Sequence, residues 1–371
     1  MLMDISSEMI HSLLPLFLVT TLGASVLVVG VIEGIAESTA LMVKVFSGTL
    51  SDYLGKRKGL ALIGYAMGAL SKPLFALAQT AGVVTAARFI DRVGKGVRGA
   101  PRDALLADIT PSHIRGAAFG LRQSLDTIGA FLGPLLAVGL MLLWSGDFRA
   151  VFWVAVIPAA LSVALLGFGL KESRDSISDK KINPFNKSSL VQLSRAYWWV
   201  VGIGAMFTLA RFSEAFLLLK GQAVGVPVTL APLVLVAMNV VYAIAAYPFG
   251  QLSDRMSHKQ LLIWGLLVLI IADLLLALAD DWVGLMAGVL LWGLHMAMTQ
   301  GLLAAMVAKT APERLRGTAY GFFNLACGLA MFAASAIAGL LWTVSGAAVT
   351  FYAGAAFCGI TLLGLIALRR H

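Results

Sequence analysis

Long apolar runs, separated by short polar breaks, fill almost the whole chain. A helix needs about 20 apolar residues to cross the hydrocarbon core of a bilayer, and twelve stretches of that kind are present. They cover approximately residues 3–22, 26–50, 59–78, 82–104, 116–143, 149–170, 196–219, 228–250, 260–279, 283–307, 317–343 and 347–368. This pattern predicts an all-α membrane protein with twelve transmembrane helices.

The stretch 171–195 is the one long polar segment between the apolar runs. It predicts a cytoplasmic linker between two domains. The N-terminal six-helix bundle would then occupy 1–170, and the C-terminal six-helix bundle would occupy 196–371.

Two short segments repeat at nearly equal spacing. GTLSD at 48–52 recurs as GQLSD at 250–254, and PSHIRGAAFG at 111–120 recurs as PERLRGTAYG at 312–321, with offsets of 202 and 201 residues. A parallel repeat of this kind predicts two bundles related by pseudo-two-fold symmetry. The substrate site is then expected between the bundles, near the bilayer midplane.

The first apolar run is shorter than its repeat. Ser7-Glu8 matches Ser213-Glu214, but seven residues precede Glu8, whereas seventeen residues from Tyr197 onward precede Glu214. We therefore expect the first helix to be truncated at its N-terminus.

Composition and charge agree with a membrane protein. Of the 371 residues, 59% are hydrophobic and 13% are charged, whereas soluble proteins average about 25% charged residues. The net charge of +9 comes largely from basic residues in alternate short loops. By the positive-inside rule, those loops, the linker and both termini are predicted to be cytoplasmic, in a multi-pass protein of the cell inner membrane. Because the basic residues are dispersed, we expect no nucleic-acid partner.

Covalent chemistry has no candidate residues in the sequence. Cys327 and Cys358 lie in apolar runs without metal-ligand spacing. Gly94-Lys95-Gly96 lacks the upstream glycine of a phosphate-binding loop. We predict no catalytic residue, cofactor or metal, and hence no enzyme. The expected partners are a small-molecule substrate, protons and the lipid bilayer, and we expect a monomer.

The segment 48–58 (GTLSDYLGKRK) and its copy at 250–259 (GQLSDRMSHK) resemble a loop signature of the major facilitator superfamily. The resemblance extends over essentially the whole chain. It implies two six-helix bundles and transport by alternating access.

The same resemblance implies a latch on the cytoplasmic side. Asp52 would cap the helix that starts near Gly317, and Asp254 would cap the helix that starts near Gly116, because a carboxylate is stabilised at the positive end of a helix. The alternative is a solvated loop aspartate. The expected gating residues are Gly48, Asp52, Arg57, Arg115, Gly250, Asp254 and Arg316.

The span 82–104 carries a stripe of charge. Arg88, Asp91, Arg92 and Lys95 follow an i, i+3, i+4, i+7 spacing, and Arg92 would lie about 15 Å from the outer end of its helix. A charge at that depth is costly in lipid, so the stripe is expected to face the bundle interior. Lys95 departs from the superfamily pattern, in which small or polar residues are usual.

The span 116–143 contains Gly129, Gly133 and Pro134. They resemble a glycine-proline signature of exporters that exchange substrate for protons, as in prokaryotic drug/proton antiporters. Close helix packing is the alternative. One turn earlier, Asp126 is expected at the depth of Arg92, so we predict that the two pair. A buried carboxylate that loses its cation is driven toward protonation, which coupling requires; a permanent salt bridge is the alternative.

Further carboxylates are candidates for proton carriage or for binding a cationic substrate. Glu33 and Glu37 are four residues apart, and pairing with Lys44 or Arg92 is their structural alternative. Arg211 and Glu214, together with Glu8, are expected to line the cleft between the halves.

The predicted function is proton-coupled export of a small organic solute or drug. Export of cations predicts that Glu33, Glu37 and Asp126 dominate. Uptake of a small organic anion, for which Arg88, Arg92 and Arg211 would supply the attraction, is the alternative. A lipid flippase on the same fold also remains open.

Overall fold

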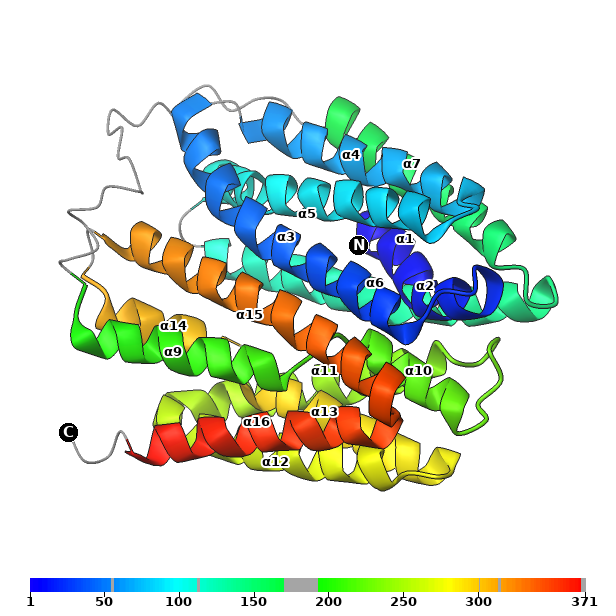
Figure 1. Cartoon of the computed structure of the whole chain (residues 1–371). Coiled ribbons are helices and arrows are strands. Elements are labelled where there is room, and N and C mark those ends of the chain that lie inside the picture. Colours follow the sequence, from blue (N-terminus) through cyan, green and yellow to red (C-terminus); the bar gives the residue numbers. More distant parts are fainter. Residues whose placement is uncertain (55–56, 112–113, 170–192, 300, 313–314, 368–371) are drawn as a thin grey trace. The chain divides into compact units, whose positions relative to one another are not determined.

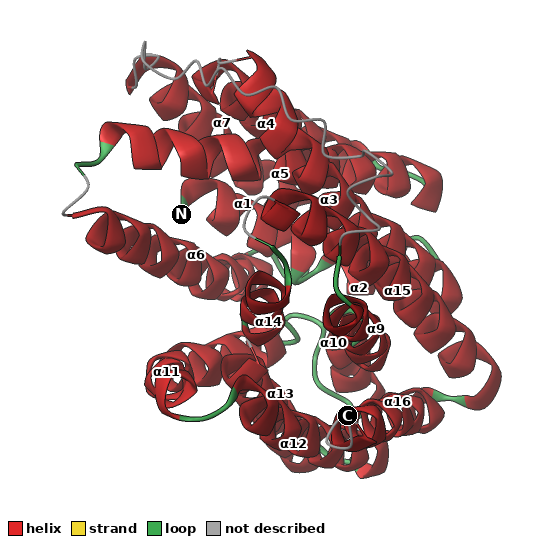
Figure 2. Ribbon diagram, turned by 90° about the vertical axis from the view of Figure 1, so that its left-hand side faces the viewer, coloured by secondary structure: helices red, strands yellow, loops and turns green. Residues whose placement is uncertain are grey.

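The structure is a computed structural model that describes residues 1–54, 57–111, 114–169, 193–299, 301–312 and 315–367. Within these residues every regular element is a helix, as Figure 2 shows. The predicted linker at 171–195 lies outside the described residues up to position 192, so its boundaries stay a prediction.

The chain divides into two compact units. Unit 1 comprises Met1–Leu22 and Ile35–Pro184, and unit 2 comprises Gly23–Gly34 and Phe185–His371. The helix α3 contributes to both. The elements of the first half are α1 (Leu2–His11), α2 (Leu14–Leu16), the π-helical turn η1 (Phe17–Thr21), α3 (Val26–Leu54), α4 (Arg57–Leu77), α5 (Ala81–Ile109), α6 (Arg115–Leu143) and α7 (Phe148–Gly169).

The second half continues with helices alone (Figure 1). They are α9 (Arg195–Ala210), α10 (Ala215–Ala223), α11 (Leu233–Arg255), α12 (His258–Leu278), α13 (Trp282–Thr299), α14 (Leu302–Thr310), α15 (Arg316–Ser345) and α16 (Ala347–Ala367).

Among the described residues, eleven helical segments are long and apolar enough to cross a membrane. The remaining predicted span is α5, which has 29 residues and is therefore about 43 Å long. It falls short in hydropathy because it carries the charged stripe. Together these segments confirm the predicted all-α fold with twelve membrane helices.

Large apolar side chains cover outward faces of these helices. Leu70 is 70% exposed, Ile244 71% and Val344 73%. A soluble protein rarely leaves so many large apolar side chains in contact with water. Their exposure is what a helix needs where it faces lipid.

Two predicted spans are interrupted. The span at 196–219 is divided into α9 and α10, and the span at 283–307 into α13 and α14. Ser213 Oγ accepts a hydrogen bond from the backbone N–H of Ala215, the first residue of α10, at 3.2 Å. Gly301, with φ of +77°, occupies the left-handed region before α14. Non-helical backbone at membrane depth is typical of helices that line a cavity or binding site.

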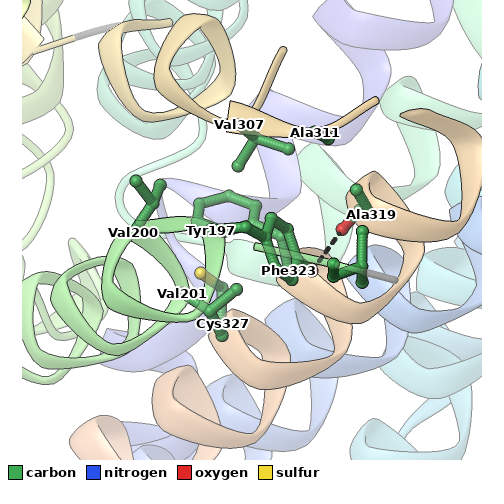
Figure 3. Packing of buried hydrophobic residues seen from close by; sticks show 9 residues of the cluster. Tyr197, Val200, Val201, Val307, Ala311, Ala319, Phe323 and Cys327 are labelled. Carbon is green, nitrogen blue, oxygen red and sulfur yellow. Dashed lines mark hydrogen bonds between the residues drawn. The ribbon is translucent and has the colours of Figure 1, made fainter. Parts of the chain in front are cut away.

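A buried cluster shows how α9, α14 and α15 pack in unit 2 (Figure 3). Tyr197 lies among Val307, Phe323 and Cys327, and its hydroxyl donates to the carbonyl of Ala319 at 2.9 Å. The phenol is thus satisfied in an apolar setting. This contact ties the start of α9 to α15.

Candidate functional site

Charged side chains of α3, α4 and α5 form a ladder of ion pairs inside unit 1, which consists of Glu37, Lys72, Arg88, Asp91 and Arg92. At its first rung, Lys72 Nζ lies 2.7 Å from Asp91 Oδ1 and donates to Ser7 Oγ at 3.0 Å. The Lys72 and Asp91 side chains are only 1% and 3% exposed. Three helices therefore converge on one buried ammonium group.

The ladder continues from Asp91 to α3. Arg92 Nε lies 3.9 Å from Asp91 Oδ2, and the other end of the guanidinium is 3.3 Å from Glu37 Oε1. Arg88 approaches the same Glu37 oxygen at 3.9 Å. Glu37 thus bridges two arginines, in agreement with the predicted alternative of pairing with Arg92.

Exposure differs sharply along the ladder. Arg88 and Arg92 are 2% and 3% exposed, whereas Glu37 is 30% exposed. A charge that is buried in a membrane protein is costly unless it is paired, and such residues usually serve transport. Glu37 is therefore the partly exposed member of the ladder.

Lys95 lies at the midpoint of α5, fourteen residues from each end, or about 21 Å along the axis. Its side chain is exposed, and no described carboxylate forms an ion pair with it. Arg92, Glu37 and Glu8 are close enough to affect it electrostatically. The sequence singled out Lys95 as part of the stripe; the structure adds that it is the accessible cation of that stripe.

The predicted pair of Arg92 and Asp126 is wrong. Asp126 Oδ2 instead lies 2.9 Å from Arg122 and 3.7 Å from Arg102. The expected span ended at 104, whereas α5 runs to Ile109. Arg92 therefore lies about 26 Å along the helix axis from the C-terminal end of α5. Asp126 lies about 17 Å from the start of α6, and it pairs with Arg102 and Arg122, which are closer to these helix ends.

The glycines of α6 hold α1 close. A Cβ atom at Gly133 would lie 2.6 Å from Cβ of Glu8 and 2.9 Å from the carbonyl oxygen of Ile5. At Gly129 it would lie 2.8 Å from Cβ of Asp4. Pro134 follows inside the same helix. These contacts place Glu8 against α6, where its carboxylate lies 3.4 Å from Nδ1 of His11.

In unit 2, the interruption between α9 and α10 collects the other candidates. Ser213 Oγ lies 3.4 Å from Glu33 Oε2, and Glu33 is fully buried. Arg211 and Glu214 pair at 3.7 Å. Glu33 lies one turn before Glu37 on α3.

The latch stays a prediction. The side chains of Asp52, Arg115, Asp254 and Arg316 lie outside the described residues, as does the environment of Gly48. Of the other expected gating residues, Arg57 begins α4 and Gly250 lies in α11.

Two site residues were missed from the sequence: Lys72 and Ser213. Lys72 had a signal, because it is a lone charge inside an apolar run. Ser213 had no signal of its own, since its role depends on where the helix breaks.

Comparisons with known proteins identify the family and the fold of the chain. The sequence pattern of the Major Facilitator Superfamily matches residues 1–220 and 202–371. An uncharacterized MFS-type transporter of Methanocaldococcus jannaschii is 32% identical over 352 residues, covering 92% of this chain and 86% of the relative. The multidrug resistance protein MdtH of Photorhabdus laumondii is 25% identical, covering 90% and 82%.

Among solved structures, the nucleoside transporter NupG has a TM-score of 0.78 at 12% identity, covering 100% of this chain and 97% of that one. The human organic anion transporter MFSD10 has a TM-score of 0.66 at 18% identity, covering 98% and 96%. The fold is shared with both. On its sequence pattern and its relatives, the chain belongs to the Major Facilitator Superfamily of membrane transporters.

Proposed function

We propose that this transporter works by alternating access and exports a small organic solute in exchange for protons, with Glu37 as a proton carrier. The observation that carries the proposal is the position of Glu37. It is the exposed member of a ladder whose other charged groups are buried.

The chemistry follows from that position. While Glu37 is ionised, it holds Arg88 and Arg92 against α3. A proton on Glu37 removes the negative charge and weakens both contacts, which frees α3 to move relative to α5. When the arginines return, the carboxyl group is driven to release its proton. Asp91 stays ionised beside Lys72 throughout.

Two further observations support export. The relative MdtH is named a multidrug resistance protein. Gly129 and Gly133, the glycines of the segment that resembles the antiporter signature, lie against the helix that carries Glu8.

Uptake of a small organic anion is the second candidate, and Lys95 is the observation that favours it. An exposed ammonium group at the midpoint of a membrane helix, without an ion-pair partner among the described residues, attracts anions. The structural neighbour MFSD10 is named an organic anion transporter.

The cellular setting belongs to the same proposal. The distribution of basic residues among the loops supports a location in the inner membrane with both termini in the cytoplasm. We further propose that it acts as a monomer.

The decisive experiment measures proton movement in proteoliposomes that contain a pH-sensitive dye, with a panel of cationic, neutral and anionic solutes. We expect a cationic or neutral solute to drive proton flux in the wild type, and Glu37→Gln to abolish it. Asp281→Asn, which changes an exposed loop carboxylate, is the control and should leave flux unchanged.

Two other results would redirect the proposal. Proton flux that survives in Glu37→Gln would exclude Glu37 as the carrier. If anions alone are transported, and Lys95→Gln abolishes their transport while Glu37→Gln does not, the anion importer replaces the exporter.

A further inference from the structure

Asp273 is a buried carboxyl group without a partner in unit 2. It lies on α12, is 0% exposed, and neither of its oxygens has a hydrogen-bond partner among the described residues. A Cβ atom placed on Gly354 of α16 would lie 2.6 Å from Asp273 Oδ2 and 3.0 Å from the ring of Phe212. The carboxyl group is therefore sealed by α16 and by the interruption between α9 and α10.

The repeat gives this position a counterpart in unit 1. Helix α12 begins and ends 201 residues after α4, and α13 begins 201 residues after α5. Contacts follow the same offset: Gly64 packs against Gly94 and Arg98, and Gly265 packs against His295 and Thr299.

The offset of 201 residues relates the pair Lys72 and Asp91 to Asp273 and Trp292. Unit 1 thus has a buried ion pair where unit 2 has a carboxyl group and an indole. The indole N–H of Trp292 is also buried without a hydrogen-bond partner among the described residues. At the position that corresponds to the cation Lys72, unit 2 therefore has the carboxyl group of Asp273.

The ionisable groups around Asp273 supply no compensating charge. From α16, the buried thiol of Cys358 faces it. On α13, His295 is hydrogen-bonded at 2.8 Å to the carbonyl of Gly265, which lies about two turns before Asp273 on α12. At the helix interruption, Arg211 is paired with Glu214.

An ionised carboxylate in such a place would be costly, because burial of a charge without a counter-ion or hydrogen bond is strongly unfavourable. A metal cation would not resolve this, since Na⁺, Mg²⁺ and Ca²⁺ need several oxygen ligands. The neighbours are the ring of Phe212 and the backbone of Gly354, and the Phe212 ring in turn packs against the indole of Trp292, with ring centroids 5.5 Å apart. A single proton is the ligand that this site accommodates.

We propose that Asp273 holds a proton in this conformation and is the proton-binding group of unit 2. Opening of the contact between Phe212 and Gly354 admits water; the carboxyl O–H bond then breaks, the proton passes to water, and the carboxylate keeps the electron pair. The role of Asp273 in transport rests on the proposed exchange of solute for protons, whereas the protonation of its carboxyl group does not.

Infrared spectroscopy tests the protonation directly, when the spectrum of each purified variant is subtracted from that of the purified wild type. At neutral pH we expect the wild type to show a carbonyl band of a protonated carboxylic acid that is lost in Asp273→Asn and kept in Asp281→Asn. Asp273→Glu, which keeps a carboxyl group, should shift the band, and it remains informative if the asparagine variant does not fold. Identical spectra for the wild type and both Asp273 variants would overturn the proposal.

A second measurement separates this inference from the proposed function. In proteoliposomes, Asp273→Asn should lose solute-driven proton flux while solute exchange at equal concentrations continues. Full solute-driven proton flux in Asp273→Asn would exclude a role of Asp273 in coupling proton movement to solute transport. If the wild type moves no protons with any solute, proton exchange fails as the function, and the infrared band alone still decides whether Asp273 is protonated.

Discussion

Lys72 and Asp91 are a pair whose energy depends on both members being present. Burying two charges costs several kcal/mol each in desolvation, and their attraction with added hydrogen bonds offsets that cost. Ser7 and Ser71, whose hydroxyl lies 3.5 Å from Asp91 Oδ1, provide the added bonds. Loss of one partner therefore leaves a buried charge uncompensated.

Asp91→Asn is expected to destabilise the protein by about 3–5 kcal/mol, because Lys72 remains buried without its anion. Thermal unfolding in detergent measures the loss. The control is Asp103→Asn, since Asp103 pairs with Arg102 at 3.1 Å but is 34% exposed; such a pair contributes about 0–1 kcal/mol. Equal losses in the two variants would contradict the ladder's role in stability.

The sequence indicated which residues of the stripe face inward and offered Arg92 as an alternative partner for Glu37, but it did not indicate the partners of Asp126. The stripe spacing indicated that Arg88, Asp91 and Arg92 point into the bundle, and they are buried. The partners depend on how far α5 extends past its neighbours. Five extra residues at the end of α5 were enough to separate Arg92 from Asp126.

The packing of α1 on α6 depends on the absence of two side chains. Gly133→Ala would place a methyl group within 2.9 Å of the Ile5 carbonyl and 3.1 Å of the Met9 nitrogen. Backbone cannot move aside as a side chain can. We expect a loss of about 1–3 kcal/mol, as for other overpacked sites, and a loss of transport because Glu8 shifts with α1.

Gly139→Ala is the matched control for Gly133→Ala. It lies on the same helix, and an added Cβ meets nothing within 4 Å. Alanine there should be neutral or stabilise by about 0.5–1 kcal/mol through helix propensity. Thermal unfolding and transport assays of the two variants together decide whether close approach, and not glycine content, is what α6 requires.

Helix positions were predictable because an apolar run of the right length has one structural solution in lipid. Helix interruptions were not. The run at 196–219 is apolar on both sides of Arg211–Glu214, and its break depends on Ser213 capturing the N–H of Ala215. Gly301 could have indicated the second break, but most glycines in this chain lie within helices.

At the scale of the whole molecule, orientation in the membrane is open to a direct test. Arg255 at the end of α11 and Asp280 between α12 and α13 are both exposed and lie at opposite ends of α12. In intact cells we expect a membrane-impermeant maleimide to label Asp280→Cys, and to label Arg255→Cys only after permeabilisation. Labelling in the reverse order would invert the proposed topology.

The native thiols do not interfere with that measurement. Cys327 and Cys358 are both buried, at 7% and 0% exposure. The protein without added cysteines provides the background, which should stay low on both sides of the membrane.

The charge on α5 bears on how the protein is made. A Lys, Arg or Asp at the centre of a helix raises the apparent free energy of translocon-mediated insertion by about 2.5–3.5 kcal/mol. Helix α5 carries Arg88, Asp91, Arg92 and Lys95 in its central part, so it cannot partition into lipid alone. Helix α4, which precedes it, brings Lys72 to Asp91, and α3 brings Glu37 to Arg92. During biogenesis, α5 is therefore expected to remain at the translocon until α3 and α4 are packed against it. The three helices then partition into the bilayer together.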